Sequence, residues 1–255
     1  MEANDDSDLV TVDVVDGVAT ITLNSPANRN ALSRRLLTDF HAALDRAEQP
    51  DVRVVVIDHV GSAFCAGMDL RERTQGDAAA NQAISSAFVS ILERIESMAP
   101  VVIAAVSGAV RAGGVGLMVA CDLIVAHSAV TFAFSEVRIG VAPAIISRPV
   151  LRRVQWSAIA APFLTGETFD AQSARAMGLI THVSDDVPAA VTALVDGVLQ
   201  GAPGAVAATK RVLRAADAVQ PYDALQAISD EMFAGPEGQE GMRSFLERRR
   251  PGWAR

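Results

Sequence analysis

The stretch that decides the fold is SAFCAGMDL, residues 62–70. It follows VRVVVID, residues 52–58, a continuous apolar run typical of a strand that is buried on both faces of a parallel sheet. The loop after this strand carries mainly small side chains, so a ligand can approach its backbone because few Cβ atoms stand in the way. The sequence therefore predicts a loop whose peptide N–H groups are available to a ligand.

A second bare loop, SGAVRAGGVG at residues 107–116, follows the apolar strand 101–106 and leads into an apolar helix. Two backbone N–H donors that converge on one point hold an oxygen that gains negative charge, and a helix N-terminus favours a nearby anion. Taken alone, either loop is also explained by tight turns and close packing. The second loop has neither a phosphate-loop pattern nor a dinucleotide fingerprint, which argues against a generic nucleotide-binding protein.

Strand and helix patterns alternate along most of the chain. A hairpin is expected around Asp16-Gly17, and Ser33 is expected to cap the helix that follows. Residues 71–82 are polar and are expected to form a loop.

The later part of the chain, from about residue 157, is rich in alanine and helical in pattern. We predict an α/β core over residues 1–195 and a helical C-terminal region over residues 196–255. Trp156 is expected in the core, and Lys210 is expected to be solvated or to reach a phosphate.

Composition limits the classes of function. The 255 residues are 50% hydrophobic and carry 22 Lys and Arg against 30 Asp and Glu, a net charge of −8, which gives no basis for nucleic-acid binding. Apolar runs end before the roughly 18 residues of a membrane span, and the acidic first residues do not resemble a signal peptide. Cys65 and Cys121 lack the spacing of a metal site. We expect a cytoplasmic protein without a metal or a membrane partner.

Three motifs carry a resemblance to a known family. SAFCAGMDL, VSGAVRAGGVGLMVACDLIVA at residues 106–126 and FAFSEVRIGVAP at residues 132–143 resemble, in this order and spacing, the enoyl-CoA hydratase/isomerase (crotonase) superfamily. Residues 10–33 and the basic tail 241–253 are similar to it as well. The resemblance implies a spiral of ββα repeats with helices that form a trimer or a dimer of trimers. It also implies an acyl-CoA substrate, with coenzyme A as part of the substrate and no separate cofactor.

The same resemblance implies site residues. The peptide N–H groups of Met68 and Gly113 would hold the thioester oxygen as it becomes an enolate. The backbone around the first loop would contact adenine, Arg29 would lie near the phosphates, and the basic tail, often from a neighbouring subunit, would face the 3′-phosphate. The expected substrate-binding residues are Arg29, Ala66, Gly67, Asp69, Leu70, Gly114, Gly116, Arg248 and Arg249.

The acid/base residues depart from the family pattern. Typical hydratases of the family use two glutamates, and the two positions here hold Gly116 and Glu136. A single carboxylate can take a proton from water and pass it to C2, or it can move a proton between two carbons. Read without the family, Glu136 is a surface acid paired with Arg138 or Arg152. The resemblance favours a catalytic Glu136, with a pKa raised by burial.

Three functions remain open at this point. A hydratase is favoured, because residues 140–151 resemble those of single-glutamate hydratases in the family. A Δ3,Δ2-enoyl-CoA isomerase would use the same groups. A crotonase-fold binding subunit that has lost catalysis would account for the missing glutamate.

Overall fold

The protein is described by a computed structural model that covers residues 8–215 and 221–254. Its strands form two sheets, a larger one in the order β1-β2-β3-β5-β7-β10 and a smaller one in the order β4-β6-β8-β9. β1 and β2 are antiparallel, as are β8 and β9, whereas the other neighbours are parallel. The strands are β1 Val10–Val15, β2 Val18–Leu23, β3 Val54–His59, β4 Ala63–Cys65, β5 Val101–Val106, β6 Ala109–Arg111, β7 Leu123–Ala126, β8 Thr131–Ala133, β9 Thr168–Asp170 and β10 His182–Val183.

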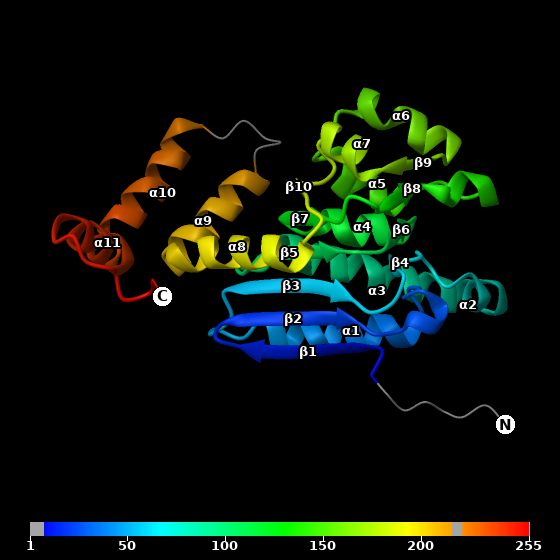
Figure 1. Cartoon of the computed structure of the whole chain (residues 1–255), viewed down its shortest axis with the longest axis horizontal. Coiled ribbons are helices and arrows are strands. Elements are labelled where there is room, and N and C mark those ends of the chain that lie inside the picture. The colour runs from blue at the N-terminus through cyan, green and yellow to red at the C-terminus, as the bar shows by residue number, and fades with distance from the viewer. Residues whose placement is uncertain (1–7, 216–220, 255) are drawn as a thin grey trace.

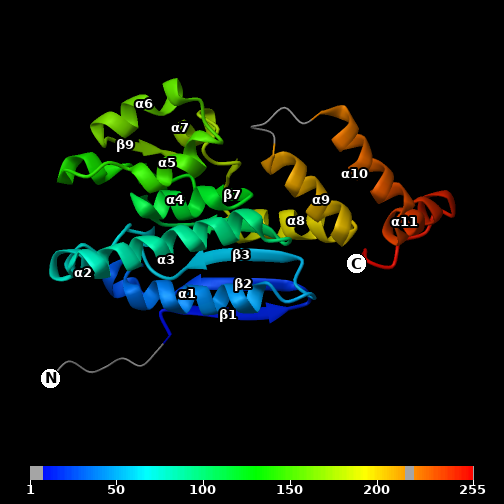
Figure 2. The same ribbon diagram turned by 180° about the vertical axis from the view of Figure 1, so that it is seen from behind.

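Helices cover both faces of the larger sheet (Figures 1 and 2). α1 and α3 pack on one face and α8 packs on the other. The helices are α1 Arg34–Ala47, α2 Leu70–Gln75, α3 Ala78–Ser97, α4 Gly113–Ala120, α5 Ala144–Leu151, α6 Trp156–Thr165, α7 Ala171–Ala176, α8 Val187–Gln200, α9 Pro203–Arg214, α10 Tyr222–Ala234 and α11 Pro236–Leu246, with short 3-10 turns η1 Pro26–Asn28 and η2 Ser135–Ile139.

The apolar run of β3 is buried on both faces, as its sequence predicts. Val55 and Ile57 belong to the core on the α1 and α3 side, whereas Val54 and Val56 belong to the core under α8. The hairpin is also confirmed, because Asp16 and Gly17 both have the positive φ of a type I′ turn. Ser33 caps α1 by accepting a hydrogen bond from the Leu36 N–H.

The chain crosses repeatedly from the larger sheet to the smaller one. β3 is followed by β4, β5 by β6, and β7 by β8, so that each pair places one strand in each sheet. This is the expected spiral of two strands and a helix. Each of the two bare loops consequently contains a short strand of the smaller sheet, β4 in residues 62–70 and β6 in residues 107–116.

The loop expected over residues 71–82 and the core position expected for Trp156 were both wrong. Residues 71–82 form the greater part of α2 and the start of α3 rather than a loop, because Asp69 and Asp77 each cap a helix N-terminus. Trp156 begins α6 and is 72% exposed, so it is not a core residue.

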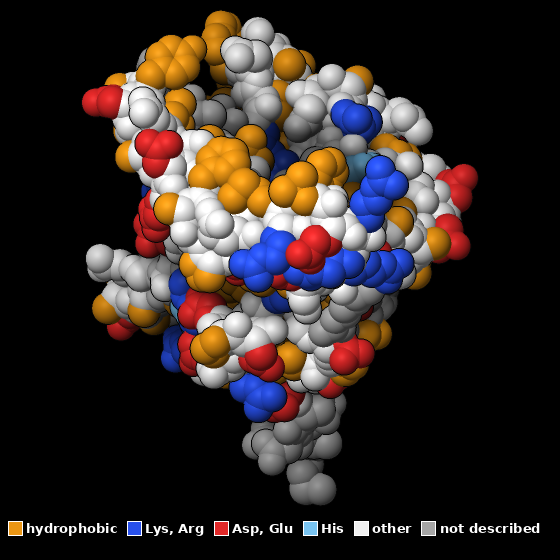
Figure 3. Space-filling model, turned by 90° about the vertical axis from the view of Figure 1, so that its left-hand side faces the viewer, with side chains coloured by type: hydrophobic (Ala, Val, Ile, Leu, Met, Phe, Trp, Pro, Cys, Tyr) orange, Lys and Arg blue, Asp and Glu red, His pale blue; other side chains and the backbone are white. Residues whose placement is uncertain are grey.

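The C-terminal part begins on the sheet and then leaves it. The expected boundary at residue 195 falls inside α8, whose Val187 and Val191 pack against the larger sheet. α10 and α11 lie at one end of the long axis (Figures 1 and 2). Figure 3 views that end and shows hydrophobic side chains beside a row of Lys and Arg. The exposed apolar side chains of α10 and α11 include Tyr222, Phe233, Phe245 and Leu246.

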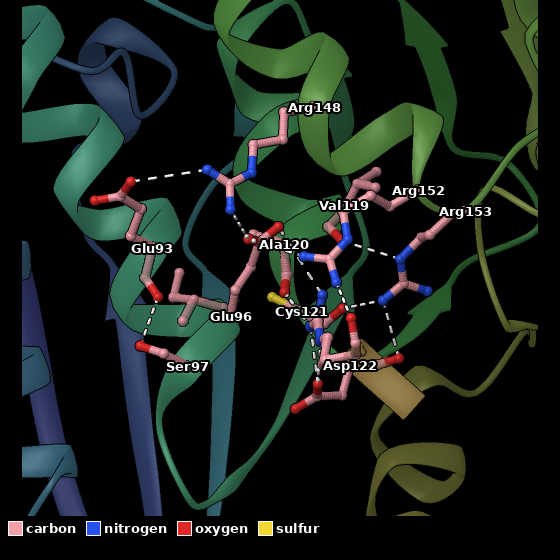
Figure 4. Close-up of polar contacts among 12 residues, drawn as sticks. Glu93, Glu96, Ser97, Val119, Ala120, Cys121, Asp122, Arg148, Arg152 and Arg153 are labelled. Atoms are coloured by element: carbon pink, nitrogen blue, oxygen red, sulfur yellow. Dashed lines mark hydrogen bonds and ion pairs between the residues drawn. The ribbon is translucent and has the colours of Figure 1, made fainter. Parts of the chain in front are cut away.

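Ion pairs fix α9 to the core. Lys210 is only 7% exposed, and its Nζ lies 2.8 Å from Asp122 Oδ2 and also donates to the Pro100 carbonyl. The expectation of a solvated lysine was therefore wrong. Arg214 contacts the other oxygen of Asp122 at 2.8 Å. Figure 4 shows Asp122 beside Arg153, which donates to the carbonyl of Val119 in α4 and to the carbonyl of Asp122 itself.

Among the described residues, no helix by itself has both the length and the apolar character of a membrane span. α8 and α9, which are bent by 111° at their junction, reach that length and composition only when they are taken together.

Candidate active site

The parallel pairing of β4 with β6 brings the two bare loops together. Parallel strands end at the same edge, so the residues after Cys65 and after Arg111 emerge side by side. Glycine makes the close approach feasible. A Cβ on Gly114 would lie 2.5 Å from the Cys65 carbonyl oxygen, and a Cβ on Gly67 would lie 2.9 Å from the Ala112 Cβ. Gly67 also has a φ of +88°, which favours glycine.

The Met68 N–H points away from the neighbouring segment at Leu32, which pairs with the first loop. Leu32 N–H donates to the Gly67 carbonyl at 2.8 Å, and Asp69 N–H donates to the Leu32 carbonyl at 3.3 Å. In such a parallel bridge the intervening residue turns its own N–H to the opposite side. Across residues 8–215 and 221–254, no protein group accepts a hydrogen bond from the Met68 N–H.

The Gly113 amide lies next to it. Gly113 is the first residue of α4, where backbone N–H groups have no acceptor within the helix, and no other acceptor is found in the described chain. A Cβ on Gly113 would be 3.7 Å from the Met68 nitrogen, which shows how close the two loops are. The sequence-predicted pair of amides is thus brought together with both donors unused.

Backbone strain precedes Gly113. Ala112 has a φ of 49° and a ψ of −124°, a conformation that residues with a side chain rarely adopt. Its N–H is held by the Ala133 carbonyl of β8 at 2.9 Å. Ala112 therefore sets the direction of the next amide, a role that its residue type did not signal in the sequence.

Both amide residues line a cavity of about 470 Å³. Its wall is mainly apolar and comes from the loops before α2 and α4, from α2 and α3, from the start of α4, and from η2 and α5 with the turn between them. The polar residues of the wall are Arg73, Asn81, Ser135 and Glu136, and the large apolar residues are Met68, Leu70, Phe88, Ile139, Val141, Ile145 and Ile146.

Glu136 is the carboxylate of this cavity. Its Oε2 is buried, and it has no hydrogen-bond partner within the described part of the chain. Burial raises the pKa of Glu136 above its ordinary value of 4.5. The surface-pair interpretation is not supported, because Arg138 donates to the Thr165 carbonyl and Arg152 contacts Glu96 (Figure 4).

Gly116 leaves no room for a second glutamate. A Cβ at this position would lie 2.3 Å from Ile146 Cγ2, so the isoleucine of α5 occupies the space that a longer side chain would need. Glu136 is the only carboxylate among the described residues that line the cavity. The departure from the two-glutamate pattern is therefore built into the packing of α4 against α5.

The other expected residues of the first loop lie around the cavity. Ala66 N–H donates to the Arg29 carbonyl at 3.0 Å, so Arg29 adjoins this loop with an exposed side chain. Asp69 is a cap rather than a free acid, because its Oδ1 accepts from the Arg71 N–H at 2.9 Å. Leu70 is 52% exposed and lines the cavity.

The basic tail lies elsewhere in this chain. Arg248 and Arg249 follow α11, at the end of the molecule opposite to α2 (Figures 1 and 2). Arg249 is engaged by Glu240 and Glu247, each at 2.6 Å. These arginines are therefore remote from the cavity of their own chain, and a role for them at a site of a neighbouring subunit stays a prediction.

A buried asparagine that sequence reasoning missed supports the first loop. Asn30 is fully buried, its Oδ1 accepts from the Ser25 N–H, and its Nδ2 donates to the carbonyls of Val60 and Ala63. It thereby ties the segment before α1 to the start of β4. No set of three or more His, Cys, Asp or Glu is placed to hold a metal ion in the described part of the chain.

The site can stabilise charge and move a proton. Two adjacent N–H donors can hold an oxygen that gains negative charge, and a desolvated carboxylate in the same cavity can exchange a proton with a nearby carbon or water. The family model "Enoyl-CoA hydratase/isomerase" matches residues 13–255 of this chain. The chain belongs to the enoyl-CoA hydratase/isomerase family.

Individual relatives agree with this membership. Enoyl-CoA hydratase EchA19 of Mycobacterium tuberculosis is 32% identical over 91% of both chains. A mevalonyl-coenzyme A hydratase of Beauveria bassiana is 34% identical over 92% of this chain and 91% of that one. The solved structure of Pseudomonas aeruginosa AtuE superposes with a TM-score of 0.90 at 31% identity, covering 97% of this chain and 100% of the other.

The contact between Gly116 and Ile146 predicts a compensating pair of substitutions. Gly116→Ala should lower the free energy of unfolding by about 1–3 kcal/mol, because the new methyl group overpacks against Ile146. Ile146→Ala should also lower the free energy of unfolding. In the double variant the total loss should be smaller than the sum of the losses in the two single variants. Denaturant unfolding of the four proteins measures this coupling, and simple additivity would contradict the packing account.

Glu136 should weaken the fold at neutral pH. The unfolded carboxyl has the ordinary pKa of 4.5 and the folded one a raised pKa, so the folded chain binds more protons between these values and loses stability as pH rises through them. Glu136→Gln should therefore raise Tm at pH 8. The gain should shrink as pH falls, and it should vanish once the Glu136 carboxyl is protonated in both the folded and the unfolded chain. Glu167→Gln, at an exposed position, is the control. An equal Tm change at both pH extremes would contradict this cause.

Proposed function

We propose that this chain hydrates the double bond of a 2-enoyl-CoA thioester with one glutamate as acid and base. The observation that carries the proposal is Glu136, which lines the cavity that also holds the amides of Met68 and Gly113 and has a buried Oε2 without a hydrogen-bond partner among the described residues. A buried carboxylate oxygen left without a partner costs stability, which a structural role would not require. The names of the relatives, which are hydratases of CoA thioesters, support the same reaction.

The chemistry follows from these groups. The thioester oxygen accepts hydrogen bonds from the two amides, which withdraws electron density from C3. A water oxygen bonds to C3 while the Glu136 carboxylate takes the water proton, and the C2=C3 electrons move to make an enolate. The same proton then passes from Glu136 to C2, and the carbonyl re-forms. One water is added, no electrons are exchanged, and Glu136 returns to its starting form.

Binding of the nucleotide part is proposed to rest on the first loop. The backbone of residues 66–70 contacts adenine, and the exposed Arg29 lies beside this loop for the phosphates. Arg248 and Arg249 reach the 3′-phosphate from a neighbouring copy in a trimer or a dimer of trimers. The exposed aromatic side chains of α10 and α11 support self-association at that end of the chain.

Isomerisation is the second candidate. The observation that favours it is the single carboxylate of the cavity, since moving a proton from C4 to C2 needs only one. The two reactions differ in their products. Hydration of a 2-enoyl-CoA yields a 3-hydroxyacyl-CoA, whereas isomerisation of a 3-enoyl-CoA yields a 2-enoyl-CoA and no hydroxyl group.

Glu136→Gln should lower kcat by about 10²- to 10⁴-fold, because the amide cannot accept the proton from water. Binding of a saturated acyl-CoA should survive, since the two amides are unchanged. Mass spectrometry of products from paired 2-enoyl- and 3-enoyl-CoA substrates, with Glu167→Gln as the matched control, tests both points. A Glu136→Gln variant with undiminished turnover would end the proposal. Absence of both turnover and CoA binding in the unaltered protein would favour a crotonase-fold subunit that has lost catalysis and acts without a CoA ligand.

A further inference from the structure

The mainly apolar wall of the cavity contains one cation, Arg73, that has no counter-ion among the described residues. Arg73 lies on α2 and is half-buried, and most of the other lining side chains are apolar. Within the described residues, no carboxylate pairs with Arg73. The acid next to it in the chain, Glu72, instead accepts a hydrogen bond from the Arg34 N–H at 2.8 Å.

Neutral groups hold Arg73 in place. Its Nη1 donates to the Asn81 carbonyl at 2.6 Å and its Nη2 donates to Ser85 Oγ at 2.8 Å. Asn81 in turn donates to the Arg73 carbonyl, so the start of α3 and the end of α2 fix each other. A guanidinium has five N–H donors, of which two are occupied here. The charge is thus positioned but not neutralised.

Most of the cavity wall surrounds the acyl chain in the proposed function, and of the segment 66–70 that is proposed for adenine only Ala66, Met68 and Leu70 belong to it. Its wall contains the Met68 and Gly113 positions and Glu136, which surround the reacting carbons in the proposed function, whereas Arg29, proposed for the phosphates, is not part of it. An alkyl chain that filled this cavity would remove water from the Arg73 guanidinium without offering a hydrogen bond or a negative charge to replace it. A carboxylate would pair with the planar guanidinium through two hydrogen bonds.

We infer that this site selects acyl-CoA substrates whose acyl chain carries a carboxylate, and that Arg73 is the residue that recognises it. The inference rests on the proposed function for its reaction and on Arg73 for its substrate class. The Arg73 charge takes no part in the hydration step, so substrate recognition accounts for its presence in the cavity.

The test compares two thioesters with acyl chains of five carbons. Glutaconyl-CoA ends in a carboxylate and 2-pentenoyl-CoA ends in a methyl group. The unaltered chain should favour glutaconyl-CoA in kcat/KM by at least about tenfold, and Arg73→Met should lower that ratio by about 10- to 100-fold. Arg73→Lys should fall between them, because it keeps the charge and loses the two-point contact.

Arg71→Met provides the matched control, because Arg71 lies on the same short helix, is exposed and does not line the cavity. It should keep the ratio of the unaltered chain, and circular dichroism should show that all variants are folded. A preference for 2-pentenoyl-CoA, or no preference, in the unaltered chain would overturn the inference. An equal loss on both thioesters in Arg73→Met would also overturn it, since that result assigns Arg73 to the CoA phosphates or to the folding of α2.

Failure of the proposed function gives a different result, namely no turnover of either thioester. The inference is then decided by calorimetry with the saturated pair, glutaryl-CoA and pentanoyl-CoA. Tighter binding of glutaryl-CoA that is lost in Arg73→Met supports it, and equal binding of the two overturns it.

Discussion

The close contact between two peptide segments, one after β4 and one after β6, is the constraint on which the rest of the structure depends. Parallel pairing of these short strands sets the two segments side by side, and glycine at 67 and 114 lets them touch where a methyl group would collide. The larger sheet and its helices supply the rigid frame for this contact. Without it, the amides of Met68 and Gly113 would belong to separate loops and could not share one acceptor.

The cavity keeps several costly features together. Ala112 holds a backbone conformation that disfavours a side chain, Glu136 has a buried oxygen without a partner, and Arg73 has no counter-ion among the described residues. Each lowers stability, and each lies where the reacting atoms or the acyl chain of the proposed substrate would lie. The ion pairs at Asp122 show the contrary case, because there each oxygen of a largely buried carboxylate pairs with a cation of α9 and fastens that helix to the core.

Sequence patterns predicted the parts of the fold that rest on local chemistry. The run 52–58, the Asp16-Gly17 turn and the Ser33 cap depend on a few neighbouring residues, and all three are confirmed. β4 and β6 were hidden because a three-residue strand has no measurable alternation. α2 was missed because its polar residues match a loop as well as a short capped helix.

The site divides in the same way. Resemblance supplied Met68, Gly113 and Glu136, since these follow ordered motifs. Ile146, which fills the space at Gly116, and Arg73, which lines the cavity from a polar segment, each lie only three residues beyond a motif in the sequence. Their contacts come from other segments, α4 for Ile146 and α3 for Arg73, so only tertiary packing shows what either residue does.

The central claim is that the amides of Met68 and Gly113 hold one and the same oxygen. A crystal structure of the chain with a bound saturated acyl-CoA measures this directly. We predict a thioester oxygen within about 3 Å of both nitrogens, with the carbons next to it facing Glu136. A thioester seated elsewhere, or an oxygen in contact with only one of the two nitrogens, would contradict the account.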